Sequence, residues 1–183
     1  MNIVVYCSAQ DGLNECYRQL ADQLGRWIGQ NGHTLVYGGV KAGLMHVTAQ
    51  AVHDSAGGRV VGVIPQMFVH RADPLCDELL TTAGLGERKE RMIEMGDVFV
   101  VLPGGIGTLD EWISTLCVME VGDSDGRGII LADTEEMFGD TLSQLGVLQR
   151  SPFARGKNLQ RTIVAKSPEQ LINELDKIAN RYE

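Results

Sequence analysis

Residues 98–111 read Val-Phe-Val-Val-Leu-Pro-Gly-Gly-Ile-Gly-Thr-Leu-Asp-Glu. The apolar run 98–102 predicts a short buried strand. The proline and glycines of 103–107 then turn the chain, and Thr108 begins a predicted helix. A glycine-rich turn from a strand into a helix exposes backbone N–H groups beside the positive end of that helix, which suits a phosphate group. Glu111 adds a carboxylate one turn further on, and the combination indicates an enzyme that acts on a nucleotide.

The same alternation of strand and helix continues through the whole chain. Apolar runs of strand length alternate with segments whose apolar residues recur at helical spacing. The predicted strands are 3–7, 34–37, 60–64, 79–82, 98–102, 128–132 and 161–165, and the predicted helices are 13–28, 44–56, 87–95, 108–121, 135–149 and 168–180. Near-continuous apolar strands between amphipathic helices indicate a parallel sheet that is covered on both faces. We therefore predict one α/β domain over residues 1–183, with a doubly wound, Rossmann-like fold.

Three turns follow the carboxyl ends of predicted strands, at residues 7–9, 38–43 and 103–108. Ligands of open α/β sheets bind at these ends. The candidate substrate-binding residues in the turns are Ser8, Gly38, Gly39, Gly104, Gly105, Gly107 and Thr108. Glycine pairs in two of the turns favour a shared anion site over glycines that only permit tight turns. The pattern is neither the dinucleotide fingerprint nor a P-loop, so we expect a mononucleotide or a sugar phosphate as ligand.

Structural explanations compete with the functional ones for several candidate residues. Thr108 and Glu111 have the spacing of a capping box, in which both side chains bond backbone N–H groups at a helix start. Arg88 and Lys89 lie among the alternating charges of 87–94, which are typical of a solvated helix face with i, i+3 and i, i+4 ion pairs. Arg88 is the better functional candidate, because a guanidinium binds phosphate or hydroxyl groups in a fixed fork. The spacing alone leaves both explanations open.

Composition and charge exclude several classes of protein. The 183 residues are 44% hydrophobic and 22% charged, as in an ordinary globular protein. A net charge of −8 argues against binding to nucleic acid or to an anionic membrane, and no segment has the length and apolarity of a membrane span. The four cysteines lack C-x-x-C spacing and the N-terminus lacks a secretion signal, so we expect a reducing cytoplasm without zinc or disulfides.

The histidines and the apolar helix stripes add two further expectations. The four histidines show no metal-binding spacing, so we expect no metal, no cofactor and no catalytic histidine. Stripes of methionine, tryptophan and leucine run along several predicted helices. Most of these side chains suit a core, and the excess suits a homodimer formed through helices.

The run Gly86-Glu-Arg-Lys-Glu-Arg-Met92, followed by Pro103-Gly-Gly-Ile-Gly-Thr-Leu-Asp-Glu111, resembles the LOG family. Its members are cytokinin riboside 5′-monophosphate phosphoribohydrolases, long mislabelled as lysine decarboxylases. The family signature is an Arg-Lys pair followed by P-G-G-x-G-T-x-x-E. Parts of 37–45 and 62–65 resemble the family as well. The resemblance covers roughly residues 1–150, and the combined motifs are specific.

This resemblance implies a homodimeric Rossmann-like enzyme without a cofactor. Its reaction hydrolyses the N-glycosidic bond of a purine nucleoside 5′-monophosphate to free base and ribose 5-phosphate. The resemblance implies that Arg88 and Glu111 are the catalytic pair. The nucleotide-contacting positions that it implies are Lys89, Gly104, Gly105, Gly107 and Thr108. Such chemistry is physically sound, because a carboxylate stabilises the oxocarbenium-like charge on the sugar and orients or deprotonates water.

The chain departs from the family pattern at the end that binds the base. Residues 117–122 replace a run similar to Thr-Trp-Ala-Gln-Leu-Gly, 126–128 replace the usual Lys-Pro, and 133–138 replace an Asn and Tyr-Tyr motif. His46 stands where a small glycine is usual. The phosphate-binding and catalytic end is intact. Both AMP and N6-substituted cytokinin nucleotides are therefore open as substrates.

Two other functions compete with the hydrolase. One is a nucleotide carrier or molybdenum-cofactor carrier without turnover, as in proteins related to the LOG family. Retention of both members of the Arg–Glu pair favours the enzyme over the carrier. The other is the old lysine decarboxylase label, which is weak because no sequence feature marks the lysine that would bind pyridoxal phosphate.

Overall fold

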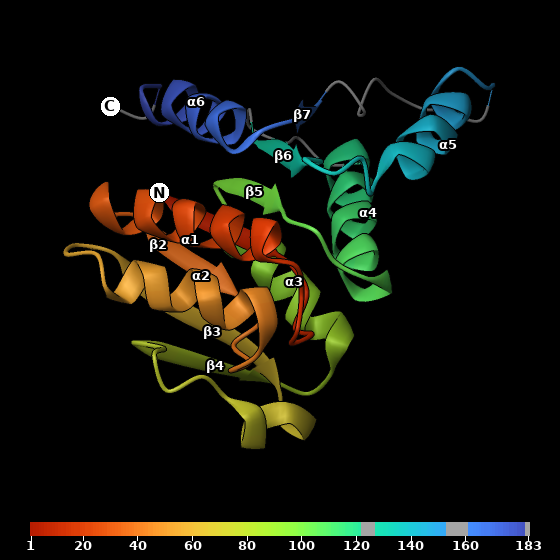
Figure 1. The fold of residues 1–183 in the computed structure, drawn as a ribbon. Helices are drawn as coiled ribbons and strands as arrows, with labels where there is room; N and C mark the ends of the chain where they lie inside the picture. The colour runs from red at the N-terminus through yellow and green to blue at the C-terminus, as the bar shows by residue number, and fades with distance from the viewer. Residues whose placement is uncertain (122–126, 153–160, 182–183) are drawn as a thin grey trace.

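The computed structural model describes residues 1–121, 127–152 and 161–181. Within these residues, seven parallel strands form one sheet (Figure 1). The strands in spatial order are β4 (Glu78–Thr82), β3 (Arg59–Pro65), β2 (Thr34–Tyr37), β1 (Asn2–Tyr6), β5 (Val98–Val101), β6 (Gly128–Ala132) and β7 (Thr162–Ala165). The predicted doubly wound parallel sheet is confirmed.

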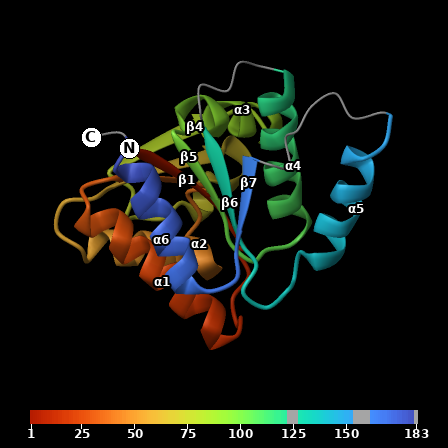
Figure 2. The same cartoon turned by 90° about the horizontal axis from the view of Figure 1, so that it is seen from above.

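Helices cover both faces of the sheet (Figure 2). On one face lie α1 (Glu15–Gln30), α2 (Gly43–His53) and α6 (Pro168–Ala179), and on the other lie α3 (Leu85–Met95), α4 (Ile106–Val121) and α5 (Gly139–Gln149). A short 3-10 helix, η1 (Gln66–Arg71), follows β3. Successive side chains of a strand point to opposite faces, so Ile3 and Val5 of β1 pack in the first core and Val4 and Tyr6 in the second. This double burial explains why the strands are almost continuously apolar.

The structure corrects several predicted helix boundaries. Helix α4 begins at Ile106 rather than at Thr108, because the last glycine of the turn adopts the helical conformation. Helix α3 begins at Leu85 rather than at residue 87. Helix α5 begins only at Gly139 rather than at residue 135. The preceding segment is a turn in which the N–H of Phe138 donates to Oδ1 of buried Asp133 at 2.8 Å.

The direction of winding reverses between β1 and β5. From β1 the chain adds β2, β3 and β4 on one side, and β5, β6 and β7 follow on the other. Ligands of open α/β sheets bind beyond the carboxyl ends of the strands at such a reversal. The turns after β1 and β5 meet at this point, because the N–H of Ser8 donates to the carbonyl of Pro103 at 3.3 Å. The fold thus brings two of the predicted turns together.

The structure also bears on membrane spans, metal sites and cysteines. No helix among the described residues has the length and apolarity needed to cross a membrane. Nor do any three histidine, cysteine, aspartate or glutamate side chains of that part of the chain gather in an arrangement that fits a metal ion. The free cysteines are Cys7, Cys16, Cys76 and Cys117.

Candidate active site

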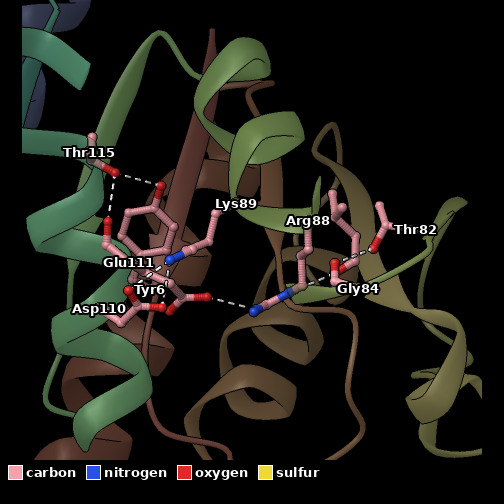
Figure 3. A network of polar contacts seen from close by, with 9 residues as sticks. Tyr6, Thr82, Gly84, Arg88, Lys89, Asp110, Glu111 and Thr115 are labelled. Carbon is pink, nitrogen blue, oxygen red and sulfur yellow. Dashed lines mark hydrogen bonds and ion pairs between the residues drawn. The ribbon is translucent and has the colours of Figure 1, made fainter. Parts of the chain in front are cut away.

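A buried ion pair joins α3 to α4 near the reversal of the sheet (Figure 3). Nη2 of Arg88 lies 2.8 Å from Oε1 of Glu111, and the two residues are only 8% and 4% exposed. Nε of Arg88 also donates to the carbonyl of Val63 on β3 at 3.0 Å, which fixes the plane of the guanidinium. The two predicted catalytic residues therefore meet inside the protein. Arg88 does not lie on a solvated helix face.

Glycine at position 38 makes room for this guanidinium. A Cβ at Gly38 would lie 2.5 Å from Nη2 of Arg88 and 2.8 Å from Cε of Met45. The neighbouring Gly39 has a φ of +68°, in the left-handed region that favours glycine. Its carbonyl accepts a hydrogen bond from the N–H of Asp73 at 2.8 Å. In the turn after β2, Gly38 therefore leaves space for the guanidinium of Arg88, and Gly39 permits the left-handed backbone of the turn.

Burial and charge act in opposite directions on Glu111. Burial raises the pKa of its carboxyl group above the ordinary value, and the positive charge of Arg88 lowers that pKa. Oε1, the oxygen that faces Nη2 of Arg88 at 2.8 Å, is itself buried. The charge of Arg88 therefore offsets part of the cost of burying this carboxylate.

The glycine-rich turn leaves the start of α4 open. The N–H of Leu109 donates to the carbonyl of Gly105 at 3.1 Å. No described residue accepts a hydrogen bond from the N–H groups of Gly105, Ile106, Gly107 or Thr108. Unpaired N–H groups at a helix start carry partial positive charge and bind anions. The start of α4 has the chemistry of a phosphate site.

Thr108 lies over Gly104 inside the first turn of this helix. A Cβ at Gly104 would collide with Oγ1 of Thr108 and lie 2.6 Å from its Cβ, so a side chain at position 104 is excluded. Thr108 is not the N-cap, and neither it nor Glu111 bonds a backbone N–H through its side chain. The capping box is therefore absent. The hydroxyl of Thr108, with no partner among the described residues, is available to a ligand.

The start of α2 is closed, in contrast to that of α4. The N–H of Gly43 donates to Oδ1 of Asp11 at 3.0 Å, and the N–H of Leu44 donates to the carbonyl of Ser8 at 2.9 Å. Oγ of Ser8 accepts a hydrogen bond from the N–H of Gln10 at 3.1 Å. Ser8 thus connects the turn after β1 to α2. Its contact with substrate stays a prediction.

Lys89 forms a second, more exposed ion pair between α3 and α4 (Figure 3). Its Nζ donates to both carboxylate oxygens of Asp110 at 2.7 Å and to Oγ of Ser114 at 3.1 Å. The side chains of Lys89 and Asp110 are 22% and 55% exposed, so water screens the pair. Exposed ion pairs of this kind contribute about 0–1 kcal/mol. A contact between Lys89 and the nucleotide stays a prediction.

Sequence reasoning missed two buried hydroxyls beneath Glu111. Oγ1 of Thr115 donates to the carbonyl of Glu111 at 2.8 Å, and the hydroxyl of Tyr6 lies 3.0 Å from Oγ1 of Thr115. Burial raises the pKa of Tyr6, so its phenol stays protonated. A tyrosine in an apolar strand and a threonine in a helix suit ordinary packing, and nothing in the pattern connects them.

His46 has a partner that the sequence did not reveal. Its Nδ1 lies 2.8 Å from Oδ2 of Asp73, whose side chain is fully buried in the loop after η1. Oδ1 of the same carboxylate accepts a hydrogen bond from the N–H of Leu75 at 3.2 Å. The histidine at this position therefore connects α2 to the loop that follows η1.

The doubly wound sheet and the glycine-rich turn at its reversal define a Rossmann-like α/β protein with an open helix start. The chain belongs to the LOG family, since the sequence model of this family, described as "possible lysine decarboxylase", matches residues 45–175. The cytokinin riboside 5′-monophosphate phosphoribohydrolase of Rhodococcoides fascians is 36% identical over 174 residues, which cover 93% of this chain and 87% of that protein. A protein of the same description from Mycobacterium tuberculosis is 36% identical over 164 residues, which cover 88% and 86% of the two chains.

The fold also matches that of a protein described by its molybdenum cofactor. The molybdenum cofactor binding protein of Rippkaea orientalis superposes with a TM-score of 0.76, covering 97% of this chain and 96% of that chain. Its sequence is 21% identical. At this level of identity the likeness concerns the fold alone.

Proposed function

We propose that this protein hydrolyses the N-glycosidic bond of a purine nucleoside 5′-monophosphate and releases the free base and ribose 5-phosphate. The observation that carries the proposal is the buried contact of 2.8 Å between Arg88 and Glu111, beside an open helix start. Two relatives at 36% identity are described as phosphoribohydrolases, which supports the same reaction class for this chain.

The start of α4 binds the 5′-phosphate in this mechanism. The unpaired N–H groups of Gly105 and Gly107 and the free hydroxyl of Thr108 donate to the phosphate oxygens. Gly104 permits the close approach of Thr108. Because Glu111 lies one turn further along the same helix, a phosphate bound at the helix start places the ribose near the carboxylate.

Glu111 acts on the anomeric carbon of the ribose. Cleavage builds positive charge on the sugar, and a carboxylate nearby stabilises that charge. The oxygen of a water molecule bonds to the anomeric carbon while the C–N electron pair leaves with the base. Glu111 accepts one proton from the water and releases it to solvent, and the departing base takes up one proton from solvent, so that one water molecule is consumed in all. Arg88 favours the ionised carboxylate against the effect of burial, which raises its pKa.

We further propose that the protein acts as a homodimer in the cytoplasm. Apolar side chains on α4 and α5, Val118 and Val147 among them, are about half exposed, and exposed apolar residues of this kind suit a protein interface. The free thiol groups of all four cysteines suit a reducing compartment. Size-exclusion chromatography with light scattering tests the dimer. A wild-type protein that is monomeric at every concentration would contradict it.

Release of free base from AMP and from N6-isopentenyl-AMP, measured by chromatography, tests the function. We expect release by the wild type and its loss in Glu111→Gln and Arg88→Ala. Glu94→Gln is the control, because Glu94 is an exposed carboxylate on α3 that pairs with Arg91. The ratio of the two rates identifies the preferred base. A wild type that binds both nucleotides without releasing base would overturn the hydrolase in favour of a carrier.

A further inference from the structure

A line of buried hydroxyl groups runs from the end of β1 to the main chain of Glu111 (Figure 3). The hydroxyl of Tyr6 lies 3.0 Å from Oγ1 of Thr115, and that Oγ1 lies 2.8 Å from the carbonyl oxygen of Glu111. Tyr6 is 1% exposed and Thr115 is 0% exposed, so solvent does not compete for these bonds. The line links the first strand of the sheet to the helix that bears the carboxylate.

Chemistry fixes the direction of both hydrogen bonds. A carbonyl oxygen only accepts, so the hydroxyl hydrogen of Thr115 is directed to Glu111. The remaining contact of Thr115 must then be an accepted hydrogen bond, and Tyr6 is its donor. The order of donation is Tyr6 to Thr115 to the carbonyl of Glu111.

The phenol of Tyr6 is a rigid starting point for this line. Its ring stacks on Phe99 of β5, with ring centroids 6.2 Å apart and an angle of 25° between the ring planes. The carbonyl of Tyr6 accepts a hydrogen bond from the N–H of Leu102 at 2.9 Å. Both contacts anchor Tyr6 in the two strands between which the sheet reverses.

The bond from a threonine to the carbonyl four residues earlier is not special to this helix, since Thr48 of α2 makes the same contact with Leu44. What distinguishes Thr115 is its second buried partner, the hydroxyl of Tyr6. The ion pair with Arg88 at 2.8 Å holds the carboxylate end of Glu111. The other end of this side chain is fixed by the main chain of α4, to which the hydroxyl of Thr115 donates.

We propose that Tyr6 and Thr115 are positioning residues that set the location of Glu111 through its carbonyl group. The proposal rests on the function proposed above, in which Glu111 acts on the sugar. A misplacement of about 1 Å lowers the rate of an enzyme about a hundredfold. A partial displacement of the main chain corresponds to a smaller loss, about tenfold.

Four variants test this assignment by base release from AMP. Thr115→Val and Tyr6→Phe each remove one hydroxyl with little change of volume, and we expect kcat to fall about tenfold at unchanged KM. Thr115→Ser retains the hydroxyl and restores kcat. Tyr37→Phe is the matched control, because Tyr37 ends β2, is fully buried, and its hydroxyl lies 3.4 Å from Sγ of Cys76, away from Glu111.

The results separate this proposal from the proposed function. Absence of base release by the wild type would refute the function itself, and release by Glu111→Gln at the wild-type rate would refute the role of Glu111 and with it the positioning role. Loss in Glu111→Gln, with wild-type kcat in Thr115→Val and Tyr6→Phe, would overturn the positioning role alone. An equal loss in Tyr37→Phe, or no recovery in Thr115→Ser, would assign the effect to packing and overturn it as well. Thermal unfolding of each variant gives its folded fraction, and kcat is divided by that fraction so that poor folding is not counted as lost catalysis.

Discussion

Replacing Gly38 by alanine is the most direct test of how the site is packed. The new Cβ would lie 2.5 Å from Nη2 of Arg88, whereas ordinary contacts of a Cβ begin at 3.4 Å. The guanidinium must then move by about 0.9 Å, which is the difference between these two distances. It cannot move freely, because Nε is bonded to the carbonyl of Val63 at 3.0 Å.

Two losses follow from this displacement. Overpacking in a filled interior costs about 1–3 kcal/mol of unfolding free energy. The ion pair with Glu111 also lengthens, and a shift of about 1 Å in a catalytic group lowers kcat/KM about a hundredfold. The loss of activity in Gly38→Ala should therefore exceed what the loss of folded protein explains.

The assay measures kcat/KM for base release together with the midpoint of urea unfolding. Gly139→Ala is the control, because a Cβ at this first residue of α5 meets no atom within 4 Å. We expect Gly139→Ala to keep its activity. Wild-type kcat/KM in Gly38→Ala would refute the argument that Gly38 is there to admit Arg88.

Three further predictions concern charge, phosphate and stability. Glu111 must be ionised to act as general base, and burial raises its pKa, so kcat/KM falls as the pH drops through that raised pKa. In Arg88→Gln the positive charge that lowers this pKa is lost, and the pH–rate profile should move to higher pH. An unmoved profile would contradict the role of the ion pair. Thr108→Val removes a phosphate donor and should raise KM for AMP about tenfold; an unchanged KM would place the phosphate elsewhere. Asp133→Ala removes the acceptor of the Phe138 N–H and of Lys166 Nζ, at 2.8 Å and 2.9 Å, and should lower the unfolding free energy by about 1–3 kcal/mol in urea titrations; an unchanged midpoint would contradict this.

The sequence was sufficient for the order of strands and helices because the five central strands are buried on both faces. Hydrophobic periodicity therefore marked β1, β5 and β6 without help from tertiary contacts. The start of α5 was not predictable in this way. The turn before it depends on Asp133, whose carboxylate binds Lys166, a residue that follows β7 far along the chain. Spacing within a segment contains no information about such a partner.

The candidate site was predictable only in part for the same physical reason. Spacing left Glu111 equally open to a capping role, and the resemblance to the LOG family favoured catalysis. The contact between Arg88 and Glu111 arises because α3 and α4 pack on the same face of the sheet. Tyr6 and Thr115 had no sequence signature, because a buried hydroxyl is recognised by its partner and not by its neighbours in the chain.

The difference between the starts of α2 and α4 has a consequence for the direction in which a nucleotide enters. Both helices begin at the same edge of the sheet, so each presents a positive end to an incoming phosphate. Asp11 supplies α2 with an internal anion at 3.0 Å from the N–H of Gly43, and that negative charge repels a second one. Of these two positive ends, only that of α4 can attract the phosphate. For the proposed function, this asymmetry predicts one of two opposite orientations of the nucleotide before any contact with the base is made.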